Sequence, residues 1–501
     1  MILGIDLGTT YSAVAAVTGP GGPTVLPNRL GELTTPSVVR FTSAGEVIVG
    51  TAARDALAFD QDNTVALVKR QMGTEFDMRF HGTTHTPESV SALILRSLVD
   101  AAGVHLGHDG DVRAVVTVPA YFGIREREAT YQAARLAGIE VLELLSEPVA
   151  AALHYGCTPA ARAGDAVLVY DLGGGTFDTT VLRVDADDVR VVATDGDSKL
   201  GGADWDERLT DYLIESFIRG AGEPTDEDAF TARTAAATEG IKRALSSRTV
   251  HRAVLRDGDA SVTVELDRAT MRELGADLVA RTLAITRRCL ESARGKGVHG
   301  VDQVVLVGGA TRMPAIAEAV QAEFGLKPQI VDPDLAVVLG AARRAHEIAS
   351  TGRATARSVV PRSFGVLIDD SHDPAGGTAI VHVVHHNEPL PARASIRLAT
   401  IVNHQRRVRV QVYEQAGDIP STATTDNRRV LDGILEGLPE LPAASPIDLE
   451  IGVDTDGLLS VSAVEPRSGN TLTLRAYVDG VVDNAASGRL ETTINGLAIG
   501  Y

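Results

Sequence analysis

The sequence predicts an α/β domain built from two duplicated lobes, followed by an all-β domain that forms an antiparallel sandwich. Three observations support this prediction. An Asp-Leu-Gly turn occurs twice, at residues 6–8 and 171–173. Strand-like runs alternate with helical patterns as far as residue 348, which is typical of α/β layers. Beyond residue 358, apolar and polar residues alternate at period two, as in strands with one buried face.

The composition is that of a soluble globular protein with several domains. A chain of 501 residues exceeds what one core supports, and 44% of it is apolar. No apolar run approaches the roughly 20 residues that span a bilayer, and residues 1–6 lack the basic start of a secretory signal. The net charge of −19 disfavours nucleic acid as a partner. Two cysteines, Cys157 and Cys289, indicate a reducing compartment, so we expect a cytoplasmic protein.

The first element is a hairpin around residues 6–10. The apolar run 2–5 leads into Asp6-Leu-Gly8-Thr9-Thr10, and a second strand-like run covers residues 12–17. The N–H groups of such a glycine turn point outward and suit an anion. We therefore expect Gly8 and the two threonines to contact phosphate.

The middle of the α/β domain contains a strand and two helices. Residues 112–118 form an apolar strand that ends at Pro119, and the charged stretch 125–137 is helical and closed by Gly138. Residues 147–156 predict a short helix, with Pro148 in its first turn and Gly156 just past its end.

The second glycine hairpin repeats the first. A strand at 166–170 enters Asp171-Leu-Gly173-Gly174-Gly175-Thr176, and a returning strand covers 179–184. A buried strand at 301–307 then leads into a third turn that starts at Gly308-Gly309. One such turn would be a weak signal, but together the turns indicate a polyphosphate site gripped from both lobes.

Acidic residues lie on these hairpins, where they would repel a phosphate. Asp6, Asp171 and Asp178 require a cation between themselves and the anion, and magnesium fits because it binds few carboxylates together with phosphates. Each aspartate alone would be read as a turn cap. Their grouping favours the metal.

The character of the sequence changes after residue 348. Residues 349–358 are small and polar and indicate a linker between an α/β domain at 1–348 and a β domain at 359–480. Within the β domain, residues 447–453, the turn 454–457 and residues 459–463 predict a hairpin. Residues 481–501 have no clear period from Asp483 onward, so we expect a loose tail.

These segments resemble the seventy-kilodalton heat-shock chaperone family over about residues 1–480. The three glycine turns match, as do residues 117–122, 146–152, 200–206 and 239–246. The resemblance implies an actin-like ATPase domain followed by a peptide-binding β domain. It also implies ATP or ADP with magnesium and potassium as cofactors, unfolded polypeptide clients, and a J-domain co-chaperone and nucleotide-exchange factor as partners.

The resemblance also implies a role for individual residues. Lys69 would orient the attacking water beside the γ-phosphate, Asp6 and Asp171 would hold magnesium through water with Glu147 nearby, and Thr176 would bind the γ-phosphate. Asp171 and Asp178 are the candidates for polarising the water. The implied nucleotide-binding residues are Gly8, Thr9, Thr10, Tyr11, Gly173, Gly174, Gly175, Gly201, Gly202, Glu239, Lys242, Arg243, Ser246, Gly308, Gly309, Arg312 and Asp334.

Two further sets of residues concern coupling and peptide binding. Pro119 and Arg127 match the family's relay between its two domains. Ile380, Val408 and Val410 are candidates for the peptide pocket, although their period-two pattern fits the sandwich core equally well.

The chain departs from the family at two places. The family's linker is leucine-rich and ends in aspartate, whereas residues 350–361 are polar and basic, so coupling between the domains should be weaker or differently built. We also expect no helical lid after the β domain, so bound peptide should dissociate quickly. Two other functions stay open: an actin-like scaffolding protein that binds ATP without coupling it to peptide, and a phosphotransferase on the same ATPase architecture.

Overall fold

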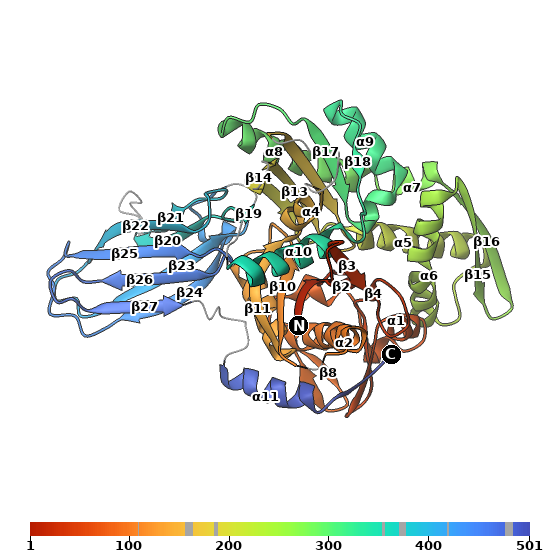
Figure 1. Cartoon of the computed structure of the whole chain (residues 1–501), viewed down its shortest axis with the longest axis horizontal. Helices are drawn as coiled ribbons and strands as arrows, with labels where there is room; N and C mark the ends of the chain where they lie inside the picture. Colours follow the sequence, from red (N-terminus) through yellow and green to blue (C-terminus); the bar gives the residue numbers. More distant parts are fainter. Residues whose placement is uncertain are drawn as a thin grey trace.

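The computed structural model describes residues 1–108, 110–155, 164–184, 189–352, 356–369, 377–417, 420–475 and 484–501. Gly156, Cys157 and the middle of the expected linker fall outside these ranges. The α/β part occupies the centre and right of the view, and the β-sheets coloured blue extend to the left (Figure 1).

The first lobe is built on a sheet of order β11-β10-β1-β2-β3, with β4 beside β2. β1 runs antiparallel to β2 and parallel to β10, so the Asp-Leu-Gly turn lies between β1 and β2. The predicted strand at 112–118 is confirmed as β10. The strands are β1 (Ile2–Asp6), β2 (Tyr11–Val17), β3 (Pro23–Leu26), β4 (Thr35–Pro36), β10 (Val112–Val118) and β11 (Ile139–Ser146).

Helices α2 (Pro87–Leu106) and α3 (Ile124–Leu136) pack on this sheet. Thr86 accepts the Ser89 N–H at 3.3 Å and Pro87 fills the first helical position, so α2 starts at a well-formed cap. Within the described chain, α2 is also the one helix long and apolar enough to span a membrane, but most of it is buried in the core of the first lobe.

The second lobe repeats the same arrangement of strands. Its sheet has the order β18-β17-β12-β13-β14-β19, with β12 antiparallel to β13 and parallel to β17. The second glycine turn therefore occupies the position that the first turn has in its own sheet. The strands are β12 (Ala166–Leu172), β13 (Phe177–Val184), β14 (Val189–Asp197), β17 (Gln303–Val307), β18 (Gln329–Ile330) and β19 (Ala356–Arg357).

Two helices cross between the lobes, α4 (Glu147–Tyr155) and α10 (Ala336–Thr351). A Cβ on Gly340 of α10 would lie 1.8 Å from the carbonyl oxygen of Ala150 in α4. The two backbones are thus in direct contact, which only glycine permits at this position.

Further elements extend each lobe around the cleft. The first lobe adds α1 (Thr51–Ala56), β5 (Val39–Ser43), β6 (Glu46–Val49), β7 (Thr64–Val65), β8 (Met78–Phe80) and β9 (Thr83–His85). The second adds α5 (Gly202–Ala221), α6 (Glu227–Ser247), β15 (Val250–Asp257), β16 (Ala260–Asp267), α7 (Arg268–Leu274), α8 (Ala276–Gly295) and α9 (Pro314–Phe324).

The β part consists of two packed antiparallel sheets, of orders β21-β20-β23-β24 and β22-β25-β26-β27. Val366, Val412, Ile451 and Val461, which come from both sheets, are buried together in its core. The predicted hairpin is confirmed, since Val453 pairs with Leu459. The strands are β20 (Phe364–Asp369), β21 (Thr378–Val384), β22 (Ala392–Ala399), β23 (Val408–Gln415), β24 (Asn427–Leu435), β25 (Pro446–Val453), β26 (Leu459–Val464) and β27 (Thr471–Arg475).

The expectation of a loose tail is wrong for residues 484–501. They form α11 (Asn484–Asn495) and β28 (Ala498–Gly500), and β28 pairs in parallel with β6 of the first lobe. Leu490 and Ile494 lie one turn apart on one face of α11, and together with Leu497, just after the helix, they pack into the core of the first lobe. Within the helix only these two large apolar residues carry the pattern, so the helical period was too weak to recognise.

The end of the expected linker is also folded. Ala356–Arg357 forms β19, which pairs in parallel with β14, and Val359 and Val360 are buried directly after it. A polar segment can pack in this way because strand pairing uses backbone groups, which do not depend on apolar side chains.

Candidate functional site

The two glycine turns, one from each lobe, lie against each other. A Cβ on Gly174 would lie 2.1 Å from Thr10 Oγ1, and a Cβ on Gly175 would lie 2.3 Å from Thr9 Cγ2. The threonines of one hairpin thus occupy space that only glycine leaves free in the other. The structure therefore brings the two turns together, and their service of one phosphate site stays a prediction.

The third glycine turn lies beside the second. Gly308 has a φ of +85°, which favours glycine. A Cβ at this position would lie 2.3 Å from the carbonyl oxygen of Leu172 and 2.7 Å from Asp171 Oδ1. Arg312, in the 3₁₀ turn η3 (Gly309–Arg312), donates from Nε to Asp334 Oδ2 at 3.1 Å. Arg312 and Asp334 are therefore brought together next to this turn.

A buried ion pair lies at the start of α4. Lys69, in the 3₁₀ turn η2 (Val68–Gln71), places Nζ 2.6 Å from Oε1 of Glu147, the first residue of α4. The side chain of Lys69 is 3% exposed and that of Glu147 11%, so the pair is largely shielded from water. Removing either residue would therefore leave an uncompensated buried charge.

Three aspartates surround this pair, and each has a raised pKa. Burial, followed by the charge of Glu147, raises the pKa of Asp6 to about 6 and that of Asp178 to about 8. Burial and the same neighbouring charge also raise the pKa of Asp171. Asp6 accepts a hydrogen bond from Thr117 Oγ1 at 2.7 Å, and Asp178 accepts one from the Tyr121 N–H at 2.9 Å.

These residues fit a magnesium ion. Asp171 Oδ2 is buried and has no hydrogen-bond partner in the described part of the chain. The three aspartates and Glu147 outnumber the buried cations that act on them, Lys69 and Arg127, so a further positive charge would stabilise the ionised carboxylates. Within the described ranges, no three such side chains are placed to ligate one ion directly. A magnesium ion here would contact few carboxylates and keep most of its waters.

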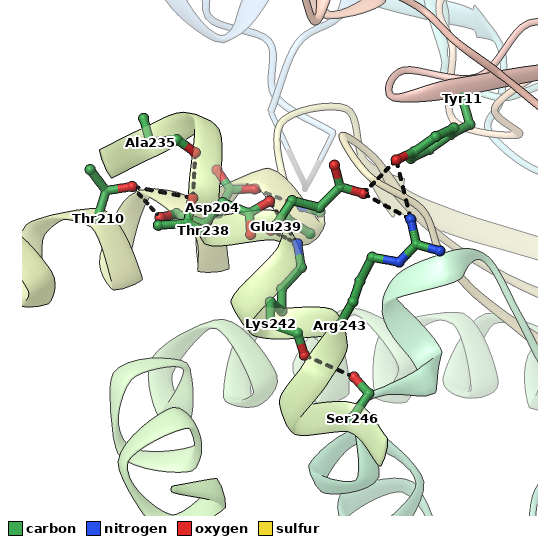
Figure 2. Close-up of polar contacts among 12 residues, drawn as sticks. Tyr11, Asp204, Thr210, Ala235, Thr238, Glu239, Lys242, Arg243 and Ser246 are labelled. Carbon is green, nitrogen blue, oxygen red and sulfur yellow. Dashed lines mark hydrogen bonds and ion pairs between the residues drawn. The ribbon is translucent and has the colours of Figure 1, made fainter. Parts of the chain in front are cut away.

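A second polar network joins the lobes near α6. Figure 2 shows Tyr11, which comes from β2, meeting Glu239 and Arg243 of α6. Tyr11 OH donates to Glu239 Oε1 at 2.9 Å, and Arg243 donates to Tyr11 OH at 3.3 Å. Burial, then the charge of Glu239, raises the pKa of Tyr11. Arg54 of α1 donates to the same hydroxyl at 3.1 Å.

Lys242 and Ser246 lie on the next turns of α6. Lys242 Nζ donates to the Gly202 carbonyl oxygen and to Asp206 Oδ2, each at 2.7 Å, and Ser246 Oγ donates to the Lys242 carbonyl at 3.1 Å (Figure 2). Both residues line a largely apolar pocket. Its other lining residues are Trp205, Leu245, Arg268, Met271, Arg272, Gly275, Val279, Met313, Pro314, Ala315, Ile316 and Glu318.

Sequence reasoning missed Arg54 and Arg70. Arg70 donates from Nε to the Gly175 carbonyl at 3.0 Å and pairs with Asp204 Oδ2 at 2.6 Å. It therefore fixes the second glycine turn to the start of α5. Its position directly after Lys69 was the one available signal, and an arginine there is equally consistent with a solvated surface.

Pro119 and Arg127 lie between the cleft and the sandwich. The Pro119 carbonyl accepts the Phe122 N–H at 3.2 Å, and Arg127 Nε donates to the Phe122 carbonyl at 3.1 Å. Arg127 Nη1 also donates to the carbonyl oxygen of Asp456, in the β25–β26 turn, at 3.1 Å. A short segment thus connects the aspartate cluster, through Tyr121, to the sandwich.

The sandwich contacts the first lobe at the start of α3. The Ile124 N–H donates to Glu414 Oε1 at 2.8 Å, and Glu414 is fully buried. Arg428 pairs with Glu414 at 2.8 Å and with Glu126 at 3.0 Å. The nearby charges of Glu414 and Glu126 outweigh the burial of Arg428 and raise its pKa.

A second contact of the sandwich reaches the other lobe. Asn387 accepts the Thr194 N–H of β14 at 2.9 Å and donates to Ser292 Oγ at 3.0 Å. The sandwich therefore touches both lobes.

The peptide-pocket candidates lie inside the sandwich or at its edge. Val410 is in the core, Val408 packs against that core, and Ile380 is 1% exposed. Their peptide-binding role stays a prediction. Ile401 and Val402, which sequence reasoning did not select, are 64% and 55% exposed between β22 and β23.

A comparison with protein families identifies one match. The family described as Hsp70 protein matches residues 2–493, nearly the whole chain. The match includes both lobes, the sandwich and most of α11.

Proposed function

The chain belongs to the Hsp70 family, and on this premise we propose that it is an ATPase whose nucleotide cycle controls the binding of extended apolar polypeptide segments. An ATP-dependent chaperone function is the general property of this family. The specific roles of residues given below are our proposal.

The observation that carries the proposal is the pair of facing glycine hairpins above a buried cluster of one lysine and several carboxylates. The turns supply N–H groups for phosphate oxygens, with hydroxyls from Thr9, Thr10 and Thr176. Magnesium, when bound, would neutralise charge on the phosphates, held through water by Asp6 and Asp171.

The same cluster offers groups that can position and deprotonate water. Lys69 is a cation fixed by Glu147 at 2.6 Å, so its ammonium group cannot move freely and can orient a water molecule. Without a metal, burial and then the charge of Glu147 raise the pKa of Asp178 to about 8; a bound magnesium would lower this pKa, so that Asp178 would be ionised and able to accept a proton near neutrality. We assign the orienting role to Lys69 and the proton-accepting role to Asp178, with Asp171 beside it.

The base would bind in the pocket beside Lys242 and Ser246, which has apolar walls and is lined by residues of the second lobe. Tyr11 of the first lobe, with Glu239 and Arg243 of the second, would supply polar groups to the ribose. A nucleotide bound there would contact both lobes, so its presence would alter their relative position.

Peptide binding would take place on the sandwich. Ile401 and Val402 form an exposed apolar pair on the segment between β22 and β23, and open strand edges can pair with an extended peptide. Arg127 and the Glu414 contact connect this domain to the cleft. These connections favour a coupled chaperone over a scaffolding protein. We further propose a cytoplasmic location, with a J-domain co-chaperone and a nucleotide-exchange factor as partners.

Single-turnover ATP hydrolysis, with and without an unfolded client, tests the proposal. We expect phosphate release without any added acceptor, which a phosphotransferase would not give. We also expect the client to accelerate release, which an uncoupled scaffolding protein would not show. Absence of magnesium-dependent ATP binding to the folded chain would refute the proposal.

A further inference from the structure

Residues 484–501 bind to the first lobe by several independent contacts. Ile494 and Leu497 are 0% and 5% exposed and belong to the core of that lobe. Arg96 of α2 donates to the carbonyl oxygens of Ile494 at 2.6 Å and Leu497 at 3.3 Å, which satisfies groups at the end of α11.

The strand β28 adds backbone pairing to these side-chain contacts. Residues 498–500 pair with residues 46–48 of β6, and the Ala498 N–H also donates to the Gly45 carbonyl at 3.0 Å. Arg29 lies over the ring of Tyr501, with its Cζ 5.1 Å from the ring centroid. Figure 1 shows α11 alongside the first lobe and the C label beyond it, well away from the sandwich.

This attachment restricts where the sandwich can go. Its last strand ends at Arg475 and α11 starts at Asn484, and a segment of this length spans at most roughly 30 Å when fully extended. At its other end the sandwich follows β19, which is paired with β14 of the second lobe. The sandwich is therefore connected to a different lobe at each end.

We propose that residues 484–501 act as a strap that keeps the sandwich on the first lobe whichever nucleotide is bound. A short connection keeps the effective concentration of the sandwich at its docking site high, in the millimolar range. The sandwich then stays near α3 without requiring a strong interface. Bound nucleotide would change the contacts of the sandwich with α3 and β14 and would not release the sandwich from the first lobe.

The amide of Ile124 reports whether the sandwich is docked. It is the first residue of α3, so its N–H has no partner within the helix. It donates instead to Glu414 of the sandwich at 2.8 Å. A Cβ on the preceding Gly123 would lie 2.6 Å from Glu414 Oε1, so the contact is close. Slow hydrogen exchange at this amide therefore requires the sandwich to be in place.

Hydrogen–deuterium exchange on the full chain tests the strap, comparing Ile494→Asp with the matched control Asn495→Asp. Residue 495 is exposed and adjacent, so the control adds the same charge without disturbing the core. We expect slow exchange at Ile124 in the wild type with ADP, with ATP and without nucleotide. Ile494→Asp should raise that rate about tenfold or more through loss of effective concentration, and the control should not change it.

A second variant covers the case in which Ile494→Asp does not fold. A protease site inserted between residues 475 and 484 of the wild type, cleaved after folding, separates the strap from the sandwich. Faster exchange at Ile124 after cleavage would support the strap. Equal exchange before and after cleavage, or fast exchange at Ile124 in the uncut protein with ADP, would overturn it. The nucleotide-free measurement decides the matter even if the protein does not hydrolyse ATP.

Discussion

The ion pair between Lys69 and Glu147 gives the most informative single perturbation. Lys69→Ala removes the cation and leaves Glu147 buried among Asp6, Asp171 and Asp178, all of which lie near it. Removing one partner of a buried ion pair typically costs about 3–5 kcal/mol, because the remaining charge is uncompensated. We expect a loss of stability within this range.

The same substitution should slow hydrolysis far more than it weakens binding. Removal of a positioned charged group commonly lowers the rate of the chemical step about 10²- to 10³-fold, whereas the glycine turns that we propose to bind phosphate remain intact. Single-turnover hydrolysis and calorimetric ATP binding, each with magnesium, separate the two effects. Lys199→Ala is the control, since Lys199 is exposed.

A double substitution distinguishes charge from geometry. Lys69→Ala with Glu147→Ala should recover much of the lost stability but not the rate, since the stranded carboxylate is gone and the orienting cation is still missing. Unchanged single-turnover hydrolysis in Lys69→Ala would refute the role assigned to this residue.

Three further predictions concern other parts of the site. Gly175→Ala should weaken ATP binding at least about tenfold by calorimetry, because the added Cβ would meet Thr9 at 2.3 Å; equal affinity would contradict the packing of the two hairpins. The pKa of Asp178 is raised from 3.8 to about 8, so between these two pH values the folded state binds more protons than the unfolded state. The free energy of unfolding without magnesium should therefore fall as pH rises from 4 to 8. Denaturant titrations should show a smaller fall in Asp178→Asn, and an equal fall would mean that Asp178 does not cause the pH dependence. Arg127→Ala should abolish the acceleration of ATP hydrolysis by a client, because it breaks the 3.1 Å contact with Asp456 of the sandwich. Hydrolysis without a client should stay within about twofold of the wild-type rate. If the client still accelerates hydrolysis, Arg127 does not couple the two domains.

The parts of the site that sequence reasoning identified have a strong local signal. The glycine turns at Gly8, Gly173 and Gly308 each follow an apolar strand. In each turn, glycine allows the main chain to lie close to neighbouring atoms of the protein. Repetition of this pattern predicted that the turns come together, and the contact between Gly174 and Thr10 agrees with it. Sequence patterns also gave the strand at 112–118 and the helix at Glu147, because Pro and Gly mark their ends clearly.

The parts that were missed depend on long-range contacts. Arg54 and Arg70 are ordinary arginines in sequence, and their roles arise only when Tyr11 and Gly175 approach from elsewhere in the fold. The pairing of β19 with β14 uses backbone groups, so the polar side chains of the linker gave no indication of it. For residues 484–501, the deciding partner is the edge of β6, more than 400 positions earlier in the sequence.

The crossing of α4 and α10 restricts how the cleft can open. Gly340 brings the backbone of α10 against Ala150, and a Cβ on Gly4 would lie 2.0 Å from the Ala342 nitrogen on the same helix. Helices in such close contact cannot slide past one another without a collision between main chains, whereas a small rotation about the contact leaves it intact. Any separation of the lobes would therefore have to occur by turning about this crossing. Enlarging residue 340 would shift this axis while leaving the glycine turns as they are.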